Sequence, residues 1–247
     1  MCGRFALNST PRRIAAHFKL SSDQFELFPR YNIAPTQPVM IVRQNAVTSQ
    51  RELTHVVWGL IPSWAKDIAI GNRMINARSE TAMEKPGYRG AMKYRRCLVP
   101  ADGFYEWRQS KVKSKAPKQP YFIHRSDGDM LALAGLWEHW QGPGGEEIES
   151  CTLLTTDANN LMAPLHDRMP VILSPGDYDR WMDVKQQDPW QVSDLLRPCP
   201  GDWLIADPVS SYVNSPRNEG EQCIAKSAVT EGPRDEERKE SPRGLFD

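Results

Sequence analysis

Short, strand-like segments between residues 39 and 155 constrain the fold of this chain more than any other feature. Each is rich in β-branched or aromatic residues and is bounded by turn residues, which is the usual pattern of a strand. They lie at 39–42, 54–58, 96–100, 104–108, 121–124, 130–137 and 151–155. No regular alternation of strands with helices connects them, and this argues against a doubly wound parallel sheet.

The helices are expected to be short and scattered. Thr10 can cap a helix that has Pro11 at its first position. The apolar face of that helix would consist of Ile14, Ala15 and Phe18. A capping residue before proline predicts two more short helices, after residues 174 and 188. The loops expected between strands are a polar turn at 45–50, a lysine-rich hairpin loop at 108–120 and a glycine-rich turn at 142–145.

Composition excludes several classes of protein. The 247 residues are 40% hydrophobic and 25% charged, as in an ordinary soluble globular protein. The 31 basic and 31 acidic residues balance, which excludes a globally basic nucleic-acid binder but not a local basic face. No apolar run approaches the roughly 18 to 20 residues that a membrane helix needs. The N-terminus lacks the long apolar stretch of a signal peptide, so export is not expected.

A single domain is expected over residues 2–224, because no linker or internal repeat divides them. Residues 225–247 differ, since they carry five basic and six acidic residues and few large apolar ones. A segment of this composition cannot bury enough apolar surface to fold alone, so a disordered tail is predicted.

The five cysteines are odd in number, widely spaced and without a CxxC pair. This argues against a disulfide framework and against a structural zinc site, and no metal or other cofactor is expected. A reducing compartment fits such cysteine usage. Cys97 and Cys151 lie in apolar runs, which predicts inert thiols of the core.

Cys2 differs from the other cysteines because it follows the initiator Met1. Removal of Met1 would leave Cys2 with a free α-amine beside its thiol. An α-amine has a pKa near 8, so roughly a tenth is neutral at pH 7. Such a 1,2-aminothiol attacks an aldehyde twice: the amine forms a Schiff base, and the thiol closes a five-membered thiazolidine ring. The second step is intramolecular and therefore favoured. The alternative is a frayed terminus with no chemical role.

Several blocks of the sequence carry a recognisable order of motifs. They are MCGRF at 1–5, RYNIAP at 30–35, WGLIPSW at 58–64, INARSET at 75–81, PADGFYEW at 100–107, LHDRMPV at 165–171, and Val213 followed by NEG at 218–220. In this order they resemble the SRAP family, the SOS-response-associated peptidase-like, abasic-site-processing proteins. Each block alone is weak, but together they span nearly all of residues 2–224.

The resemblance implies a fold and an activity. The expected fold is α+β, a compact single domain around a curved, barrel-like mixed β core with short peripheral helices. The expected activity is recognition of abasic sites in single-stranded DNA and formation of a thiazolidine DNA–protein crosslink through Cys2, which shields the lesion. Removal of the protein's own N-terminal residue, a peptidase activity, is also described for family members.

The resemblance further implies catalytic roles for Cys2 and three other residues. Asn76 would hold the imine through its amide, and Glu106 would move protons at the amine. His166 would assist opening of the sugar hemiacetal, since imidazole titrates near neutrality. Two of them have a plainer alternative: Asn76 could cap a turn, and Glu106 could be exposed, because neighbouring side chains alternate along a strand.

DNA contacts are implied for four residues. Arg4 and Arg78 resemble the family's phosphate-contacting arginines, and Arg168 could meet a phosphate as well. Trp64 could stack on a base, or could instead be a core or lid residue. Between residues 72 and 100, seven basic residues against two acidic ones favour a local basic face, although a solvated helix face would look the same.

Three other functions remain open at this point. An amidotransferase of the N-terminal-nucleophile type also begins Met-Cys-Gly, and glutamine hydrolysis would identify it. A peptidase acting on other proteins could use the same cysteine. A non-catalytic single-strand-binding module would bind any strand in a salt-sensitive way without a covalent product. The expected partner is single-stranded DNA with an abasic site, bound by a monomer with no membrane association. The expected compartment is the cytoplasm, at the nucleoid, in a prokaryote, or the nucleus in a eukaryote.

Overall fold

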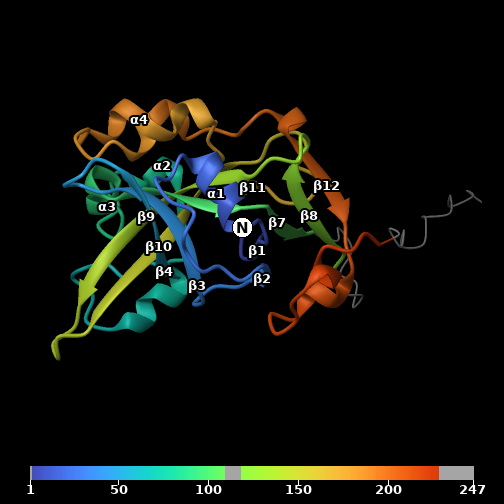
Figure 1. Ribbon diagram of the computed structural model, residues 1–247, viewed down its shortest axis with the longest axis horizontal. Coiled ribbons are helices and arrows are strands. Elements are labelled where there is room, and N and C mark those ends of the chain that lie inside the picture. The colour runs from blue at the N-terminus through green and yellow to red at the C-terminus, as the bar shows by residue number, and fades with distance from the viewer. Residues whose placement is uncertain (1, 109–117, 228–247) are drawn as a thin grey trace, which may run out of the picture.

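The computed structural model describes residues 2–108 and 118–227. Its larger sheet closes into a barrel, which lies on the left of Figure 1. Five strands of the described chain pair in a circle: β10 (Glu147–Asp157), β4 (Arg51–Trp58), β3 (Pro38–Gln44), β6 (Arg96–Ala101) and β9 (Leu131–Gln141), which returns to β10. The β10–β4 pairing is parallel and the others are antiparallel, so the barrel is mixed. The predicted α+β fold with a curved, barrel-like core is therefore confirmed.

A second sheet, which the sequence did not predict as a separate unit, packs beside the barrel. Its order in the described residues is β12 (Leu204–Pro208), β8 (Pro120–Arg125), β7 (Gly103–Trp107), β1 (Phe5–Leu7) and β2 (Arg30–Ile33). All of these pairings are antiparallel. In Figure 1, β1 lies near the middle of the molecule, between the barrel and β8.

Two short strands extend the barrel at the last residues of β10. These are β5 (Asn76–Arg78), parallel to β10, and β11 (Arg168–Pro170), antiparallel to it. Thr155 of β10 pairs with Arg78 on one edge and with Pro170 on the other. The chain thus brings residues 76–78 and 168–170 to the two sides of one strand.

The helices are short, as expected. They are α1 (Pro11–Phe18), α2 (Ser79–Ala82), α3 (Arg89–Tyr94) and α4 (Tyr178–Met182), with 3-10 helices at Ile68–Arg73, Pro175–Asp177, Pro189–Leu195, Gly201–Trp203, Ser211–Asn214 and Glu221–Cys223. The Thr10 hydroxyl accepts a hydrogen bond from the backbone N–H of Arg13, and Pro11 occupies the first turn of α1. The predicted apolar face of α1 is buried.

The predicted strands all exist, with β9 and β10 extended to a turn at 142–145. Five short strands were missed, namely β1, β2, β5, β11 and β12. The expected hairpin loop falls between β7 and β8, where the Arg108 N–H donates to Gln119 O, but its residues 109–117 lie outside the described ones.

The C-terminal boundary needs a correction. Residues 225–227, assigned to the tail by composition, hydrogen-bond with residues 208–210, through Ser210 N to Ala225 O and Ser227 N to Pro208 O. Lys226 also pairs with Asp207 at 2.9 Å. The fold therefore includes these three residues, while the rest of the expected tail, 228–247, lies outside the described residues.

The core fills the barrel and the layer between it and α4. Cys97 and Cys151 are fully buried in it, and burial raises the pKa of both thiols, as expected of inert core residues. Across residues 2–108 and 118–227, no helix has the length and apolar character needed to cross a bilayer.

Candidate active site

Cys2 lies at the entrance to β1 and is fully buried. The strand that follows it is fixed on both edges, since Phe5 pairs with Ile33 of β2 and with Phe104 of β7. Phe5 also packs edge-on against Trp58, with ring centroids 5.2 Å apart. The predicted alternative of a frayed terminus does not hold for Cys2, because the strand holds it inside the molecule.

Asn76 reaches Cys2 from β5. Its Nδ2 donates a hydrogen bond of 2.7 Å to the carbonyl oxygen of Cys2. The indole N–H of the buried Trp58 donates to Ile75 O at 2.9 Å and so fixes the start of β5. The Oδ1 of Asn76 is buried and has no hydrogen-bond partner among the described residues. A buried, unused acceptor beside a nucleophile is available for a substrate hydroxyl or an amine.

Glu106 reaches the same place from β7. Its side chain is 4% exposed, so the alternative of an exposed polar residue is wrong. It is buried because β7 is the middle strand of the second sheet, and both of its faces are covered there. The neighbouring Tyr105 is fully buried as well.

The Cys2 thiol is held in its neutral form. Burial, and after it the negative charge of the Glu106 carboxylate, raise its pKa to about 12. The thiol therefore stays protonated at neutral pH. A protonated thiol is a poor nucleophile, which favours the amine as the group that attacks first.

His166 follows a tight turn and precedes β11. Its backbone N–H donates to Met162 O at 2.9 Å, and its ring is 16% exposed. The ring Nδ1 accepts the backbone N–H of Arg168 at 2.9 Å and lies 2.8 Å from the Asp167 carboxylate. One nitrogen cannot make both bonds at once. The Nδ1 atom therefore has two alternative partners, the Arg168 backbone N–H and the Asp167 carboxylate.

Arg168 is occupied by contacts within the protein. Its guanidinium binds Glu80 at 2.7 and 2.8 Å, Asp157 at 2.6 Å and the carbonyl of Thr155 at 2.7 Å. These bonds tie β11 to α2 and β10. The predicted phosphate contact stays a prediction, but it would have to compete with three partners.

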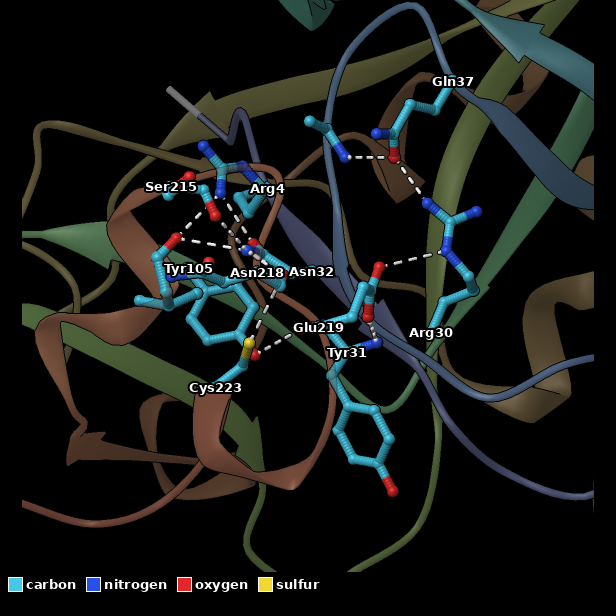
Figure 2. A network of polar contacts seen from close by, with 12 residues as sticks. Arg4, Arg30, Tyr31, Asn32, Gln37, Tyr105, Ser215, Asn218, Glu219 and Cys223 are labelled. Carbon is cyan, nitrogen blue, oxygen red and sulfur yellow. Dashed lines mark hydrogen bonds and ion pairs between the residues drawn. The ribbon is translucent and has the colours of Figure 1, made fainter.

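Arg4 is likewise anchored, as Figure 2 shows. Its Nη1 donates to Asn32 Oδ1 at 2.7 Å and to Val213 O at 2.9 Å. Its guanidinium lies over the ring of Trp107, 5.6 Å from the centroid, and burial lowers its pKa. Arg4 thus stands two residues from Cys2 in a fixed position, and its Nη2 has no hydrogen-bond partner among the residues described.

The predicted basic face exists in part. Within the described chain, five exposed cations of segment 72–100 make no hydrogen bond or ion pair through their side chains: Arg73, Arg78, Lys85, Arg89 and Lys93. The other two cations are occupied, since Arg95 pairs with Glu138 at 2.7 Å and Arg96 is buried against backbone carbonyls.

Trp64 stands beside this face and is 59% exposed, so it is not a core residue. It lines a groove of about 520 Å³ together with Arg89, Arg95 and Glu138. The groove lies at the α3 side of the barrel and contains none of the residues around Cys2. In the sequence, Arg78 lies between Asn76, which contacts Cys2, and the groove residue Arg89.

Two residues of the site were not predicted as functional. Trp107 directly follows Glu106, and its indole N–H donates to Asn214 at 2.7 Å under the Arg4 guanidinium. Its position next to the predicted glutamate was the available signal. Asn32 lies in the RYNIAP block without a predicted role, yet it connects Arg4 with the segment 213–218. That role depends on contacts too distant in sequence to be read locally.

No group of three or more histidine, cysteine, aspartate or glutamate side chains suited to a metal ion occurs within residues 2–108 and 118–227. The side chains gathered at Cys2 are an amide and a carboxylate. They can polarise and move protons at an amine, which is the chemistry of imine formation.

Known proteins of similar sequence and structure match nearly the whole chain. The family model "SOS response associated peptidase (SRAP)" matches residues 1–216. The abasic site processing protein YoqW of Bacillus subtilis is 42% identical over 91% of this chain and 99% of its own. The chicken abasic site processing protein HMCES is 34% identical over 79% of this chain and 66% of its own.

Solved structures agree. A crystal structure of a Bacteroides thetaiotaomicron protein superposes with a TM-score of 0.80 at 26% identity, covering 92% of this chain and all of the other. With a matching family model, a relative above 40% identity and a shared fold, the chain belongs to the SRAP family.

Proposed function

We propose that this protein processes abasic sites by forming a thiazolidine crosslink between Cys2 and the lesion in single-stranded DNA. One observation carries the proposal: a fully buried Cys2 is held by Asn76 at 2.7 Å and lies within the electrostatic reach of the buried Glu106. Similarity to abasic site processing proteins in bacteria and vertebrates supports it.

The first step is imine formation. After Met1 is removed, the α-amine of Cys2 attacks C1 of the ring-opened sugar, and the resulting carbinolamine loses water to give C=N. Glu106 accepts the ammonium proton and returns one to the departing hydroxyl. The unused Oδ1 of Asn76 can accept a hydrogen bond from the amine or the sugar.

The second step is ring closure. The Cys2 sulfur adds to the imine carbon, and the thiol proton ends on the nitrogen, so the product has the mass of protein plus DNA minus one water. The thiol has a pKa of about 12, so its proton has to leave as the bond forms. Because the sulfur lies next to the imine carbon, ring closure is intramolecular and needs no bimolecular collision. This makes the step fast.

The surrounding cations support binding of one strand. Arg78 and Arg89 are exposed and carry no partner among the described residues, so phosphates can neutralise them without breaking an ion pair. The exposed ring of Trp64 offers a stacking surface for a base. Selectivity comes from the lesion, because only an abasic nucleotide presents an aldehyde.

The same groups suit removal of Met1 by the protein itself. Transfer of the Met1 acyl group from the Cys2 nitrogen to its sulfur, followed by hydrolysis of the thioester, would consume one water and release methionine. Glu106, buried beside Cys2, is placed to protonate the leaving amine. The intact mass of purified full-length protein should show the loss of one methionine in the wild type and not in Cys2→Ser. That difference would identify this activity.

The decisive experiment mixes mature protein with a single-stranded oligonucleotide containing one abasic site, beside an intact-base control. We expect a species that survives denaturation, with the mass of protein plus DNA minus water, and its absence in Cys2→Ser. Binding without any covalent product, once Met1 removal is verified, would refute the crosslink. Glutamine hydrolysis would then be assayed next.

A further inference from the structure

A segment near the end of the described chain covers the strand that follows Cys2. Residues 209–224, which we call the carboxy-terminal clasp, contain the 3-10 helices Ser211–Asn214 and Glu221–Cys223 and pack against β2. Figure 2 shows the polar contacts that join the clasp to Arg4, which directly precedes β1, and to β2. The clasp contributes no group to the chemistry proposed above, so its contacts call for an explanation of their own.

Asn32 is the centre of these contacts. It is fully buried, and its Oδ1 accepts the Arg4 guanidinium at 2.7 Å. Its Nδ2 donates to three carbonyl oxygens of the clasp, those of Val213 at 3.3 Å, Ser215 at 2.9 Å and Asn218 at 2.8 Å. A buried amide whose donors and acceptor are all used fixes the groups around it, since any displacement leaves one of them unsatisfied.

Glu219 fastens the clasp a second time. One carboxylate oxygen accepts the backbone N–H of Tyr31 at 2.8 Å, and the other accepts the Nε of Arg30 at 3.1 Å. Both partners belong to β2 and directly precede Asn32 in the sequence. The clasp is thus held to one strand by a buried amide and by a half-exposed carboxylate.

The network continues to the nucleophile through Arg4 and Tyr105. The Cys2 thiol makes a long contact of 4.0 Å to the carbonyl oxygen of Arg4, and the same oxygen accepts the backbone N–H of Tyr105 at 2.9 Å. The Tyr105 hydroxyl in turn donates to Tyr31 O at 2.6 Å. Arg4 is therefore held at its side chain by Asn32 and the clasp, and at its backbone by the strand that carries Glu106.

We propose that Asn32, with the clasp it holds, is a positioning residue that aligns the Cys2 thiol for ring closure. Its hydrogen bonds go to Arg4 and to the clasp, not to Cys2, so it acts through Arg4. The inference rests on the proposed function and deepens it, because it assigns this network to the second step. Imine formation depends on the amine, Asn76 and Glu106, which the clasp does not contact. Ring closure depends on where the sulfur points, and Arg4 O is the group that orients it.

The test separates the two steps in the full-length, mature protein. Cyanoborohydride reduces the imine as it forms, so the adduct trapped with it, two hydrogens heavier than the thiazolidine, reports the first step. The adduct formed without reductant reports both steps. In Asn32→Ala we expect the unaided rate to fall about 10- to 100-fold, the cost of a misplacement near 1 Å, while the trapped rate stays within about twofold of wild type.

Two further variants keep the test decisive. Glu219→Gln weakens the outer attachment without creating a buried cavity, and we expect the same step-specific change at about threefold. Asn45→Ala is the matched control, because Asn45 also bridges one side chain and two backbone N–H groups, at the distal turn between β3 and β4. It should leave both rates unchanged.

The outcomes are distinct. A selective loss of the unaided rate in Asn32→Ala and Glu219→Gln, absent in Asn45→Ala, supports the positioning role. Equal loss of the trapped and the unaided rate overturns the positioning role. A wild-type ratio of the two rates in both variants overturns it as well. In either case the crosslink itself stands. If Asn32→Ala does not fold, the ratio in Glu219→Gln decides alone. If wild type yields neither adduct, the proposed function fails and this inference fails with it.

Discussion

Glu106 acts on Cys2 in two opposed ways. Its negative charge adds to burial in raising the pKa of the thiol. In the proposed mechanism, its carboxylate is also the base that takes the proton of the amine. A residue with both effects can delay the sulfur while it promotes the nitrogen, which orders the two steps of the reaction.

Replacement of Glu106 by glutamine should separate these effects. In Glu106→Gln the thiol pKa should drop below about 12, because the charge that adds to burial is gone. Alkylation of Cys2 should therefore begin at lower pH, since the thiolate fraction rises tenfold for each pH unit below the pKa. Crosslinking should nevertheless slow about 100-fold, within the range typical of a lost general base. Peptide mapping after iodoacetamide at several pH values, together with crosslinking rates, measures both. Crosslinking at the wild-type rate would remove Glu106 from the mechanism.

Asn76 offers a second test at this scale. Asn76→Ala removes the donor to Cys2 O and the unused acceptor, so we expect the trapped imine to form at least about 10-fold more slowly. Asn159→Ala is no suitable control, because Asn159 shapes the turn before His166. Asn45→Ala serves again, and equal rates in Asn76→Ala and wild type would contradict the assigned role.

Among the elements, β5 shows how a strand of three residues can hold a side chain, Asn76, against Cys2. Trp58 fixes its start, and Gly59, with φ of +134°, lets the chain pass so close to Gly71 that a side chain at residue 59 would collide with the Gly71 carbonyl. The position of Asn76 therefore depends on packing around β4 rather than on β5 itself.

Trp58→Phe should reveal this dependence. It removes the bond to Ile75 O and leaves a cavity, which should cost about 2 kcal/mol of unfolding free energy. Crosslinking should fall as well, because Asn76 moves. Trp181→Phe is the matched control, since Trp181 is also fully buried and donates to Cys97 O at 2.8 Å, but on the α4 side of the barrel. Urea unfolding should show similar losses in both variants, and only Trp58→Phe should crosslink more slowly. An equal loss of crosslinking in both would assign it to stability alone.

The elements differ in how far the sequence predicts them. Helix α1 has a capping threonine, a proline and a periodic apolar face, so its bounds could be read locally. The strands β3, β4, β6 and β9 carry long apolar runs and were also predicted. The strands β1, β5 and β11 have three residues each, too few for a periodic pattern, and exist through pairing with distant strands. The barrel and the site residues were predicted from the family motifs. The role of Asn32 was not predicted, because its partners in the clasp lie about 180 positions away in the sequence.

At the scale of the whole molecule, zero formal net charge hides an uneven surface. Five exposed cations without partners among the described residues lie in segment 72–100, whereas Arg43 and Arg180 are paired with carboxylates. A negatively charged strand would thus be attracted to the face that carries these cations.

Salt dependence of binding can test that face. Each phosphate neutralised on a single strand contributes about 0.7 to the slope of log affinity against log salt. We expect Arg78→Gln to reduce the slope by about that amount when measured with an intact-base oligonucleotide, which cannot crosslink. Arg12→Gln removes an equally exposed cation on α1 and should leave the slope unchanged. Equal slopes for Arg78→Gln and wild type would place the strand elsewhere.

The burial of Cys2 also bears on how long such a protein keeps its activity. Peroxide and small electrophiles react with thiolate, and a fully buried thiol with a pKa of about 12 offers almost none at neutral pH. In the proposed mechanism each protein molecule reacts once, because the crosslink consumes the Cys2 that forms it. A protein that acts only once gains most from a nucleophile that oxidants and metabolites leave intact until a lesion arrives.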